Sequence, residues 1–304
     1  AVIEEVTNRF TMQRAKNKYI KTNGISHHYL DWGNPSLQPI ILMHATGLCA
    51  SVWHPIATEL ATSNHVMAFD QRGHGNTDKS DTGYSFELIG EDLASIIEAL
   101  DVTNVFVVGH SSGGIATLIA DHLLPGRINK ALLVETRILD GRGPGGELKQ
   151  RADRTRMKRK IWEDHISMHL AYRSRTAFKN WDEECFDSFI EDGTELLPDG
   201  RAELKCLPEV EATFYEQRET LIISEYFDRL TAKYKILIGE YPGAQRIDDE
   251  DLVKFLDTVP SANAKLMGIG SHFLPLEHPQ IVLEEIKSFF NSTNRNPNCS
   301  KIKS

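Results

Sequence analysis

The feature that most constrains the fold of this chain is a regular alternation of short apolar runs with helical patterns. The apolar runs are rich in Val, Ile and Leu, as is typical of strands that are buried on both faces. They are PIILMHA (39–45), HVMAFDQ (65–71), NVFVVGH (104–110) and KALLVET (130–136). Helical patterns separate them at 52–63, 85–100 and 115–124. This alternation predicts βαβ units and a mostly parallel sheet, and therefore an α/β fold.

The alternation stops after Thr136 and resumes near residue 231. A Gly/Pro loop, GRGPGGE, comes first, and a charged stretch with helical periodicity and no clear buried strand continues to about Leu230. Strand and helix patterns then return in YKILIGE, DDEDLVKFLDTV, AKLMGIG and HPQIVLEEIKSFF. We therefore expect one core domain formed by 1–136 and 231–304, with 137–230 inserted as a helical cap. Near the start, an NG step between two strand candidates predicts a hairpin.

Composition excludes several classes of protein. The chain has 304 residues, 40% of them hydrophobic, and a net charge of −9, which argues against nucleic acid as the main partner. No apolar stretch is long enough for a membrane span, and the first residues contain no signal-peptide core. The four cysteines are scattered, which favours a reduced, cytoplasmic protein, with a Cys185–Cys206 disulfide as the alternative.

The segment GHSSG, residues 109–113, lies where a predicted strand meets a predicted helix. A serine hydroxyl needs exposure and a nearby base to act as a nucleophile, and a sharp strand-to-helix turn provides the exposure. Gly109 and Gly113 flank Ser111 at positions −2 and +2, where small residues let the strand and helix pack closely. We therefore predict that Ser111 is a nucleophile, rather than part of an ordinary tight turn.

Three segments together identify a family. GHSSGG, DQRGHGNTD (70–78) and GSHFLPLEHPQ (270–280) resemble the α/β-hydrolase superfamily, in both order and spacing, from about Tyr19 to Phe290. The resemblance implies an α/β-hydrolase fold with an inserted cap, and a histidine base in the loop after the last core strand. His272 has that position, whereas His110 and His278 are expected to be structural. The DQRGHG segment is expected to be scaffolding, with Asp70 and Arg72 tying its loop together.

The acid of the implied triad departs from the common pattern. Most relatives carry an Asp shortly after the strand that corresponds to YKILI, and this chain has Pro242 at that position. A minority of the superfamily carries the acid at the end of the preceding strand, 24 residues after the nucleophile, where this chain has Glu135. We predict Glu135 as the acid, with Glu240 as the alternative.

An oxyanion hole requires two backbone donors. The N–H of Ser112, at the start of the helix after the nucleophile, is one candidate. The resemblance implies a second donor in the loop HATG after the strand at 39–43, where we expect the N–H of Thr46. Trp53, a few residues further on, is expected either to form a wall of the pocket or to belong to the core.

The predicted cap contains two further groups of interest. Aromatic residues could line a substrate pocket from above, and some of them must pack the cap itself; they are Trp162, Trp181, Phe214 and Tyr215. A run of basic residues is interleaved with acidic ones, so a solvated helix face is favoured over an anion site; it comprises Arg151, Arg154, Arg156, Lys158, Arg159 and Lys160.

These observations predict a serine hydrolase that cleaves a small carboxylic ester or lactone through Ser111, His272 and Glu135. A hydrolase of carbon–carbon bonds in ring-cleavage products is one alternative, and a ligand receptor derived from a hydrolase is another. No motif for a metal or a nucleotide is present, so no cofactor is expected. The oligomeric state stays open, with a homodimer as one alternative.

Overall fold

A nine-stranded sheet forms the centre of the protein, which is described here by a computed structural model that covers residues 15–141, 147–292 and 302–303. The strand order is β1-β2-β4-β3-β5-β6-β10-β11-β12, antiparallel among β1, β2 and β4 and parallel from there on. The strands are β1 Lys16–Thr22, β2 Ile25–Trp32, β3 Pro39–Met43, β4 His65–Phe69, β5 Val105–His110, β6 Ile128–Val134, β10 Lys233–Ile238, β11 Asn263–Leu266 and β12 Ile302–Lys303. The predicted strands are therefore confirmed.

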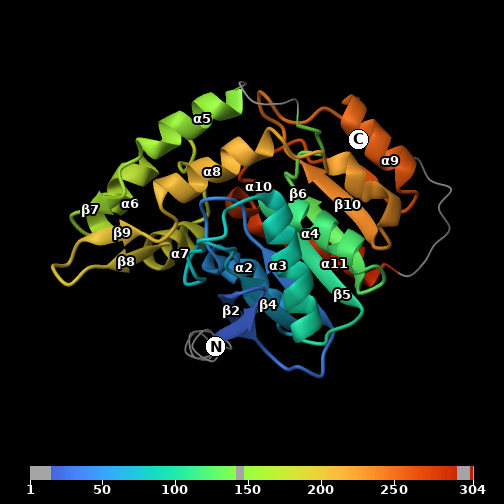
Figure 1. Cartoon of the computed structure of the whole chain (residues 1–304), viewed down its shortest axis with the longest axis horizontal. Coiled ribbons are helices and arrows are strands. Elements are labelled where there is room, and N and C mark those ends of the chain that lie inside the picture. Colours follow the sequence, from blue (N-terminus) through green and yellow to red (C-terminus); the bar gives the residue numbers. More distant parts are fainter. Residues whose placement is uncertain (1–14, 142–146, 293–301, 304) are drawn as a thin grey trace, which may run out of the picture.

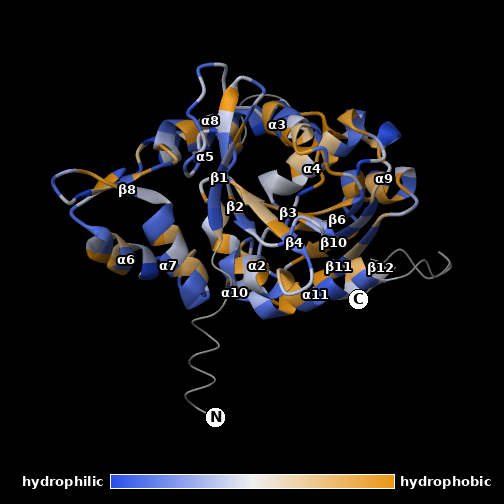
Figure 2. Ribbon diagram, turned by 90° about the horizontal axis from the view of Figure 1, so that it is seen from below, coloured by the Kyte–Doolittle hydropathy of each residue, from blue (hydrophilic) through white to orange (hydrophobic). Residues whose placement is uncertain are grey.

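Helices cover both faces of this sheet (Figure 2). One face carries α3, α4 and α9, and the other carries α2, α10 and α11. The bounds are α2 His54–Leu60, α3 Phe86–Ala99, α4 Ser112–Leu123, α9 Glu250–Thr258, α10 Leu274–Glu277 and α11 Pro279–Asn291, with a 3-10 helix η1 at Ala50–Trp53. The α/β class and the mostly parallel sheet follow the prediction.

The alternation of side chains along each strand divides the core into two halves. In β3, Ile41 and Met43 pack with α3 and α4, whereas Ile40 and Leu42 pack with α2 and α11. Successive residues of a strand point to opposite faces, so a strand that is covered on both faces must be apolar throughout. This explains why the parallel strands are continuous apolar runs in the sequence.

The N-terminal hairpin forms at the predicted NG step. β1 pairs with β2 in register from Lys16 opposite Asp31 to Thr22 opposite Ile25. Asn23 and Gly24 between them have φ values of 50° and 79°. Two successive positive φ angles are what a type I′ turn requires, and Asn followed by Gly tolerates them at low cost.

The inserted segment extends to one side of the sheet (Figure 1). Its elements are α5 Glu147–Arg156, β7 Ile161–Trp162, α6 His165–Arg173, α7 Glu183–Asp192, β8 Thr194–Leu196, β9 Ala202–Leu204 and α8 Pro208–Arg218. The short strands form a small antiparallel sheet of order β7-β9-β8, which the expectation of a purely helical segment missed. The two- and three-residue strands are too short to give a periodic sequence signal.

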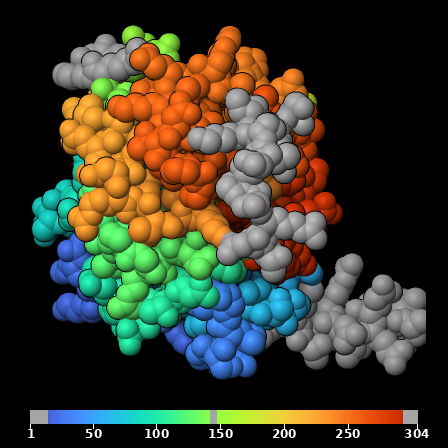
Figure 3. Space-filling model, turned by 90° about the vertical axis from the view of Figure 1, so that its right-hand side faces the viewer, coloured from blue at the N-terminus to red at the C-terminus, as the bar shows by residue number. Residues whose placement is uncertain are grey.

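The last element before β10 is the 3-10 helix η2, Ile223–Arg229, which buries Ile223 and Phe227 in the same cluster as α3, α4 and α9. Segments from before and after the insertion adjoin on the face seen in Figure 3, where green atoms meet orange ones. In the sheet, β6 pairs directly with β10.

Three cysteines lie in the described part of the chain, and each is buried as a free thiol: Cys49, Cys185 and Cys206. The alternative of a Cys185–Cys206 disulfide is therefore wrong, and Cys299 lies outside the described residues. Burial raises the pKa of Cys49 to about 12, which keeps this thiol protonated. Across the described residues, no helix combines the length and apolar character that a membrane crossing needs.

Candidate active site

Ser111 occupies a strained turn between β5 and α4. Its φ is 53° and its ψ is −113°, a conformation that residues other than glycine rarely adopt. The Ser111 N–H donates to the Val134 carbonyl at 3.0 Å, which fixes the turn to the end of β6. Backbone strain of this kind costs of order 1–3 kcal/mol and persists only where the surroundings enforce it.

The glycines around Ser111 are required by close packing. A Cβ on Gly109 would lie 2.5 Å from the Gly114 nitrogen, and one on Gly113 would lie 2.3 Å from the Met43 carbonyl oxygen. Real Cβ atoms do not approach backbone atoms so closely, so any side chain here would push α4 away from the sheet. The strand, turn and helix thus form as the GHSSG segment predicts.

His272 and Glu135 come together at the carboxyl end of the sheet. The His272 Nδ1 lies 3.4 Å from the Glu135 Oε2, and the Glu135 carboxylate is buried. Glu135 directly follows β6, and its φ of 51° turns the side chain toward the loop that carries His272. Its carboxylate also accepts from the Tyr241 hydroxyl at 2.6 Å and from the Gly239 N–H. These two donors hold the buried charge beside the imidazole.

Glu240, the alternative acid, has a different environment. It is exposed, and its backbone N–H donates to the carbonyls of Ile269 and Gly270. Its side chain makes no hydrogen bond or ion pair with any described residue. The structure thus brings Glu135, and not Glu240, to His272.

His110 holds the backbone of His272 from below. Its Nε2–H donates to the His272 carbonyl at 2.7 Å. Burial, with a further contribution from His272, lowers the pKa of His110 to about 3. His110 is therefore a neutral donor to the His272 backbone at physiological pH, with its proton on Nε2.

The predicted oxyanion donors, Thr46 and Ser112, line the same cavity as Ser111. Neither backbone N–H has an acceptor among the described residues. A network of buried side chains supports the Thr46 loop: the Gly47 N–H donates to His74 Nε2 at 2.8 Å, and the Gln71 side chain reaches both the His44 carbonyl and the Ser112 hydroxyl. The backbone on both sides of the hole is therefore tied to one scaffold.

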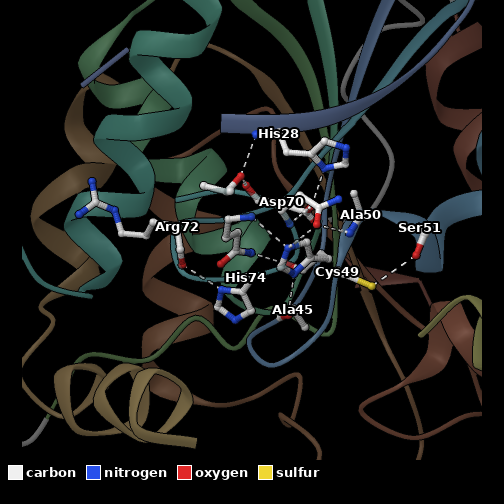
Figure 4. Close-up of polar contacts among 12 residues, drawn as sticks. His28, Ala45, Cys49, Ala50, Ser51, Asp70, Arg72 and His74 are labelled. Carbon is white, nitrogen blue, oxygen red and sulfur yellow. Dashed lines mark hydrogen bonds and ion pairs between the residues drawn. The ribbon is translucent and has the colours of Figure 1, made fainter. Parts of the chain in front are cut away.

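That scaffold is the DQRGHG segment (Figure 4). Asp70 accepts from the Ala50 N–H at 2.7 Å and from His28 Nδ1 at 2.6 Å, and Arg72 forms a two-point ion pair with Asp92. Burial lowers the pKa of His74 to about 3, so this ring stays neutral and accepts from the Gly47 N–H. The segment therefore performs the scaffolding that the sequence predicts, and His74 and Gln71 extend it to the loop of Thr46 and to Ser112.

A cavity of about 870 Å³ opens above Ser111, between the core and the inserted segment. Ser111, Ser112, Thr46 and His272 form its floor. Its apolar walls include Leu48, Phe86, Ile115, Leu139, Leu148, Phe178, Phe189 and Phe273. The volume is that of a site for a small organic molecule.

Of the five aromatic residues predicted to contact a substrate, only Tyr215 lines this cavity. The prediction is wrong for the other four, which are buried in hydrophobic clusters: Trp53, Trp162, Trp181 and Phe214. Trp181 packs behind the cavity wall, with its ring centroid 5.1 Å from that of Phe273 and 4.9 Å from that of Phe178. Large aromatic side chains gain most free energy when they are fully buried, and here the core and the base of the insertion offer that burial.

The basic run of the insertion divides into two sets. Arg156, Arg159 and Lys160 each pair with a carboxylate outside the cavity, on Glu216, Glu163 and Glu203 respectively. Arg151, Arg154 and Lys158 line the cavity. Half of the run therefore differs from the expected solvated helix face.

Three side chains on the outside of the insertion, those of His169, Glu183 and Asp187, offer ligand atoms within 4.8 Å of one another. The carboxylates already have partners, because Glu183 pairs with Arg173 at 2.6 Å and Asp187 pairs with His169 at 3.1 Å. These ion pairs account for the grouping without a metal ion.

Comparison with known proteins identifies the family of the chain. Residues 40–285 match the alpha/beta hydrolase family along most of the chain. The protein belongs to the alpha/beta hydrolase family. Its sequence is 35% identical to a non-heme chloroperoxidase of Streptomyces lividans over 116 residues, which is 37% of this chain and 42% of that protein. The match thus spans less than half of that relative's length.

Solved structures of other alpha/beta hydrolases share the whole fold. The E-2-(acetamidomethylene)succinate hydrolase superimposes with a TM-score of 0.80 at 19% identity, over 91% of this chain and all of that one. The enol-lactonase from Burkholderia xenovorans LB400 superimposes with a TM-score of 0.69 at 17% identity, over 90% of this chain and all of that one. At this identity the likeness establishes the fold.

Several residues of this hydrolase site were not singled out from the sequence. Tyr241 follows Glu240 directly and donates to Glu135, but a loop tyrosine carries no signal of its partner. Phe178, Phe189 and Phe273 line the cavity, and only the position of Phe273 next to His272 pointed to it. Ser111, His272, Thr46 and Ser112 thus line one cavity, and the buried Glu135 carboxylate lies beside His272. Acyl transfer needs residues of these types as nucleophile, base, acid and backbone donors.

Proposed function

We propose that this alpha/beta hydrolase cleaves a small carboxylic ester or lactone through a Ser111–His272–Glu135 triad. The observation that carries the proposal is the buried Glu135 carboxylate, 3.4 Å from the His272 Nδ1, at the edge of the sheet where the strained Ser111 turn lies. Because a carboxylate in this position orients the imidazole and stabilises its cation, His272 gains the ability to take a proton from serine.

In the proposed reaction, the Ser111 Oγ attacks the carbonyl carbon while the His272 Nε2 takes the hydroxyl proton. The oxyanion of the tetrahedral intermediate accepts from the N–H groups of Thr46 and Ser112. The bond from carbon to the leaving oxygen then breaks, and His272 transfers its proton to that oxygen. A water molecule attacks the acyl group on Ser111, His272 takes the water's proton, and the proton returns to the Ser111 Oγ as the carboxylic acid leaves.

The cavity supports ester chemistry on a small substrate. Its apolar walls suit an acyl chain or a ring, and its floor presents the nucleophile and both oxyanion donors to the same space. The name of the enol-lactonase indicates that the same fold cleaves a lactone in that protein. A lactone fits the same mechanism, since its leaving oxygen stays attached to the acyl group.

The test is the initial rate of hydrolysis of p-nitrophenyl acetate, butyrate and hexanoate, with the Ser111→Ala variant alongside. We expect turnover that disappears in the variant, and a fluorophosphonate adduct that mass spectrometry places on Ser111. Absence of both turnover and adduct in folded protein would contradict the proposal. An adduct without ester turnover would favour a narrower substrate, such as a carbon–carbon bond next to a ketone, or the receptor.

A further inference from the structure

Part of the cavity wall is rich in charge. Among the described residues it contains five cationic side chains and four carboxylates. The cations are Arg137, Arg151, Arg154, Lys158 and Arg218, and the carboxylates are Asp140, Glu147, Glu211 and Glu219. With all nine ionised, one net positive charge remains. A ligand with a single negative charge would therefore bring this wall to neutrality.

Most carboxylates on this wall have donors of their own. Glu211 pairs with Lys158 at 2.6 Å and also accepts from the Tyr215 hydroxyl at 3.1 Å. Asp140 accepts from the Ser224 N–H at 2.8 Å and from its hydroxyl at 2.6 Å. These contacts occupy carboxylates that could otherwise neutralise the arginines.

The four arginines have no carboxylate partner in the described part of the chain. Arg218 donates to the Leu139 carbonyl at 2.5 Å, and its pKa, lowered by burial to about 10, still leaves it charged at neutral pH. Arg151 stacks at 4.2 Å on the Tyr215 ring and donates to its hydroxyl at 3.1 Å. Arg137 and Arg154 are exposed, line the cavity and form no ion pair with a described residue.

The lining of the cavity places these charges within reach of one ligand near the nucleophile. Arg151 and Arg154 lie three residues apart on α5, so they share the side of this helix that faces the cavity. Lys158 lines the cavity from the turn that follows α5. Arg137 lines it from the segment after β6, two residues after Glu135.

We propose that the substrate carries a carboxylate, distant from the scissile ester, which binds to the arginine wall formed by Arg137, Arg151 and Arg154. The inference rests on the proposed ester or lactone hydrolysis. A guanidinium presents a planar fork of donors that matches a carboxylate, so that the pair can form two parallel charge-assisted hydrogen bonds. The wall then sets the orientation of the substrate, and the apolar residues hold the chain between its two ends.

The experiment compares two series of chromogenic esters. One series comprises the mono-p-nitrophenyl esters of glutaric, adipic and pimelic acid, and the other contains the same compounds with the free carboxylate replaced by a primary amide. We expect the wild-type protein to prefer the acid over the matching amide in kcat/KM by about 10- to 100-fold for the best chain length, as is typical of a charged hydrogen-bonding pair. Spontaneous hydrolysis is subtracted with Ser111→Ala.

Variants then assign the preference to the wall. Arg151→Gln combined with Arg154→Gln should lower the ratio of acid to amide kcat/KM to near unity, mainly through KM for the acid. Arg156→Gln is the matched control, because it removes the same charge from the same helix at a side chain that pairs with Glu216 outside the cavity. It should leave the ratio unchanged. Raising the salt concentration should reduce the preference of the wild-type protein.

The outcomes separate this inference from the proposed function. Equal turnover of acid and amide by the wild-type protein, or an unchanged ratio in the double variant, would overturn the arginine wall while leaving ester hydrolysis intact. If neither series is hydrolysed, the proposed function fails, and titration of glutarate into the wild-type protein and the double variant decides the inference alone. Binding that the double variant loses would support it, and no binding to either would overturn it.

Discussion

The two walls of the cavity differ in how they hold their side chains. On the core side, Ser111 and Glu135 sit at the ends of neighbouring parallel strands, with φ values of 53° and 51° that the sheet enforces. On the side of the insertion, side chains reach the cavity from α5 and α8, and several are charged and form no ion pair with a described residue. The core wall is built to hold a few atoms in place, whereas the opposite wall is built to present charge.

This difference indicates that the two walls suit different functions. Strained backbone and buried hydrogen bonds suit chemistry, since reacting groups must stay within a fraction of an ångström of their positions. Exposed arginines on helices suit selection, because a charged ligand can bind them at several distances from the nucleophile. Substitutions on the core wall should therefore change the rate for every substrate, and those on the other wall should change the ranking among substrates.

The largest effect is expected at the nucleophile. Ser111→Ala should lower kcat by about 10⁵-fold or more for all esters, as removal of a serine nucleophile does elsewhere. Ser112→Ala is the matched control, because it removes the neighbouring hydroxyl, which contacts Gln71, and keeps the backbone N–H. We expect it to lose less than about tenfold. Equal losses for both variants would break the assignment of Ser111 as nucleophile.

The acid should give the next largest effect. Glu135→Gln should lower kcat by about 10²–10⁴-fold, because the amide no longer stabilises the imidazolium of His272. Glu240→Gln, at an exposed side chain, should stay within about threefold of the wild-type rate. Steady-state kinetics of both variants, with unfolding curves to verify folding, make this measurement. The reverse order of effects would move the acid to Glu240.

The core wall could be predicted from the sequence because its signals are local. Glycines around Ser111 are needed for a tight turn, and an apolar run that ends in Glu135 marks a carboxylate at a strand end. The opposite wall could not be predicted in this way. Which side of a helix faces the cavity depends on contacts between residues that are distant in the sequence. Phe214 and Tyr215 are neighbours on α8, and their side chains point about 100° apart, so that one is buried and the other lines the cavity.

A smaller effect is expected for the aromatic residues that the sequence placed in the cavity and the structure places in hydrophobic clusters. Trp162→Ala should lower the free energy of unfolding by about 3–5 kcal/mol, since it removes a buried ring that packs against Tyr172, while the ranking among esters stays the same. Phe178→Ala, at a ring that lines the cavity, should change that ranking. Denaturant titration and the ester series together separate the two. A changed ranking in Trp162→Ala would return Trp162 to the cavity wall.

The smallest expected effect is on the free energy of unfolding at acid pH, through His110 on the core side of the cavity. In the folded protein the pKa of His110 is about 3, whereas its ordinary value is 6.5. Between these two pH values, His110 therefore binds a proton in the unfolded chain and stays neutral in the folded protein. The folded state therefore loses stability as pH falls below 6.5, by about 2–3 kcal/mol at pH 4.5 from this one residue.

His110→Gln removes that loss and keeps a donor for the His272 carbonyl. The variant should thus depend less on pH than the wild-type protein between pH 7 and 4.5. Urea titrations at several pH values measure the two slopes. Parallel slopes would show that burial of His110 does not hold in solution.

The position of the insertion in the chain also sets the order in which the site is made. Thr46, Ser111, Ser112 and Glu135 all precede the insertion, and His272 follows it. A ribosome that adds roughly 5–20 residues per second therefore synthesises the nucleophile on the order of ten seconds before the base. Until β10 and β11 join the sheet and deliver His272, the nascent chain carries a serine without a base to activate it. The proposed chemistry thus becomes available only after the whole insertion and the strands that follow it have been synthesised.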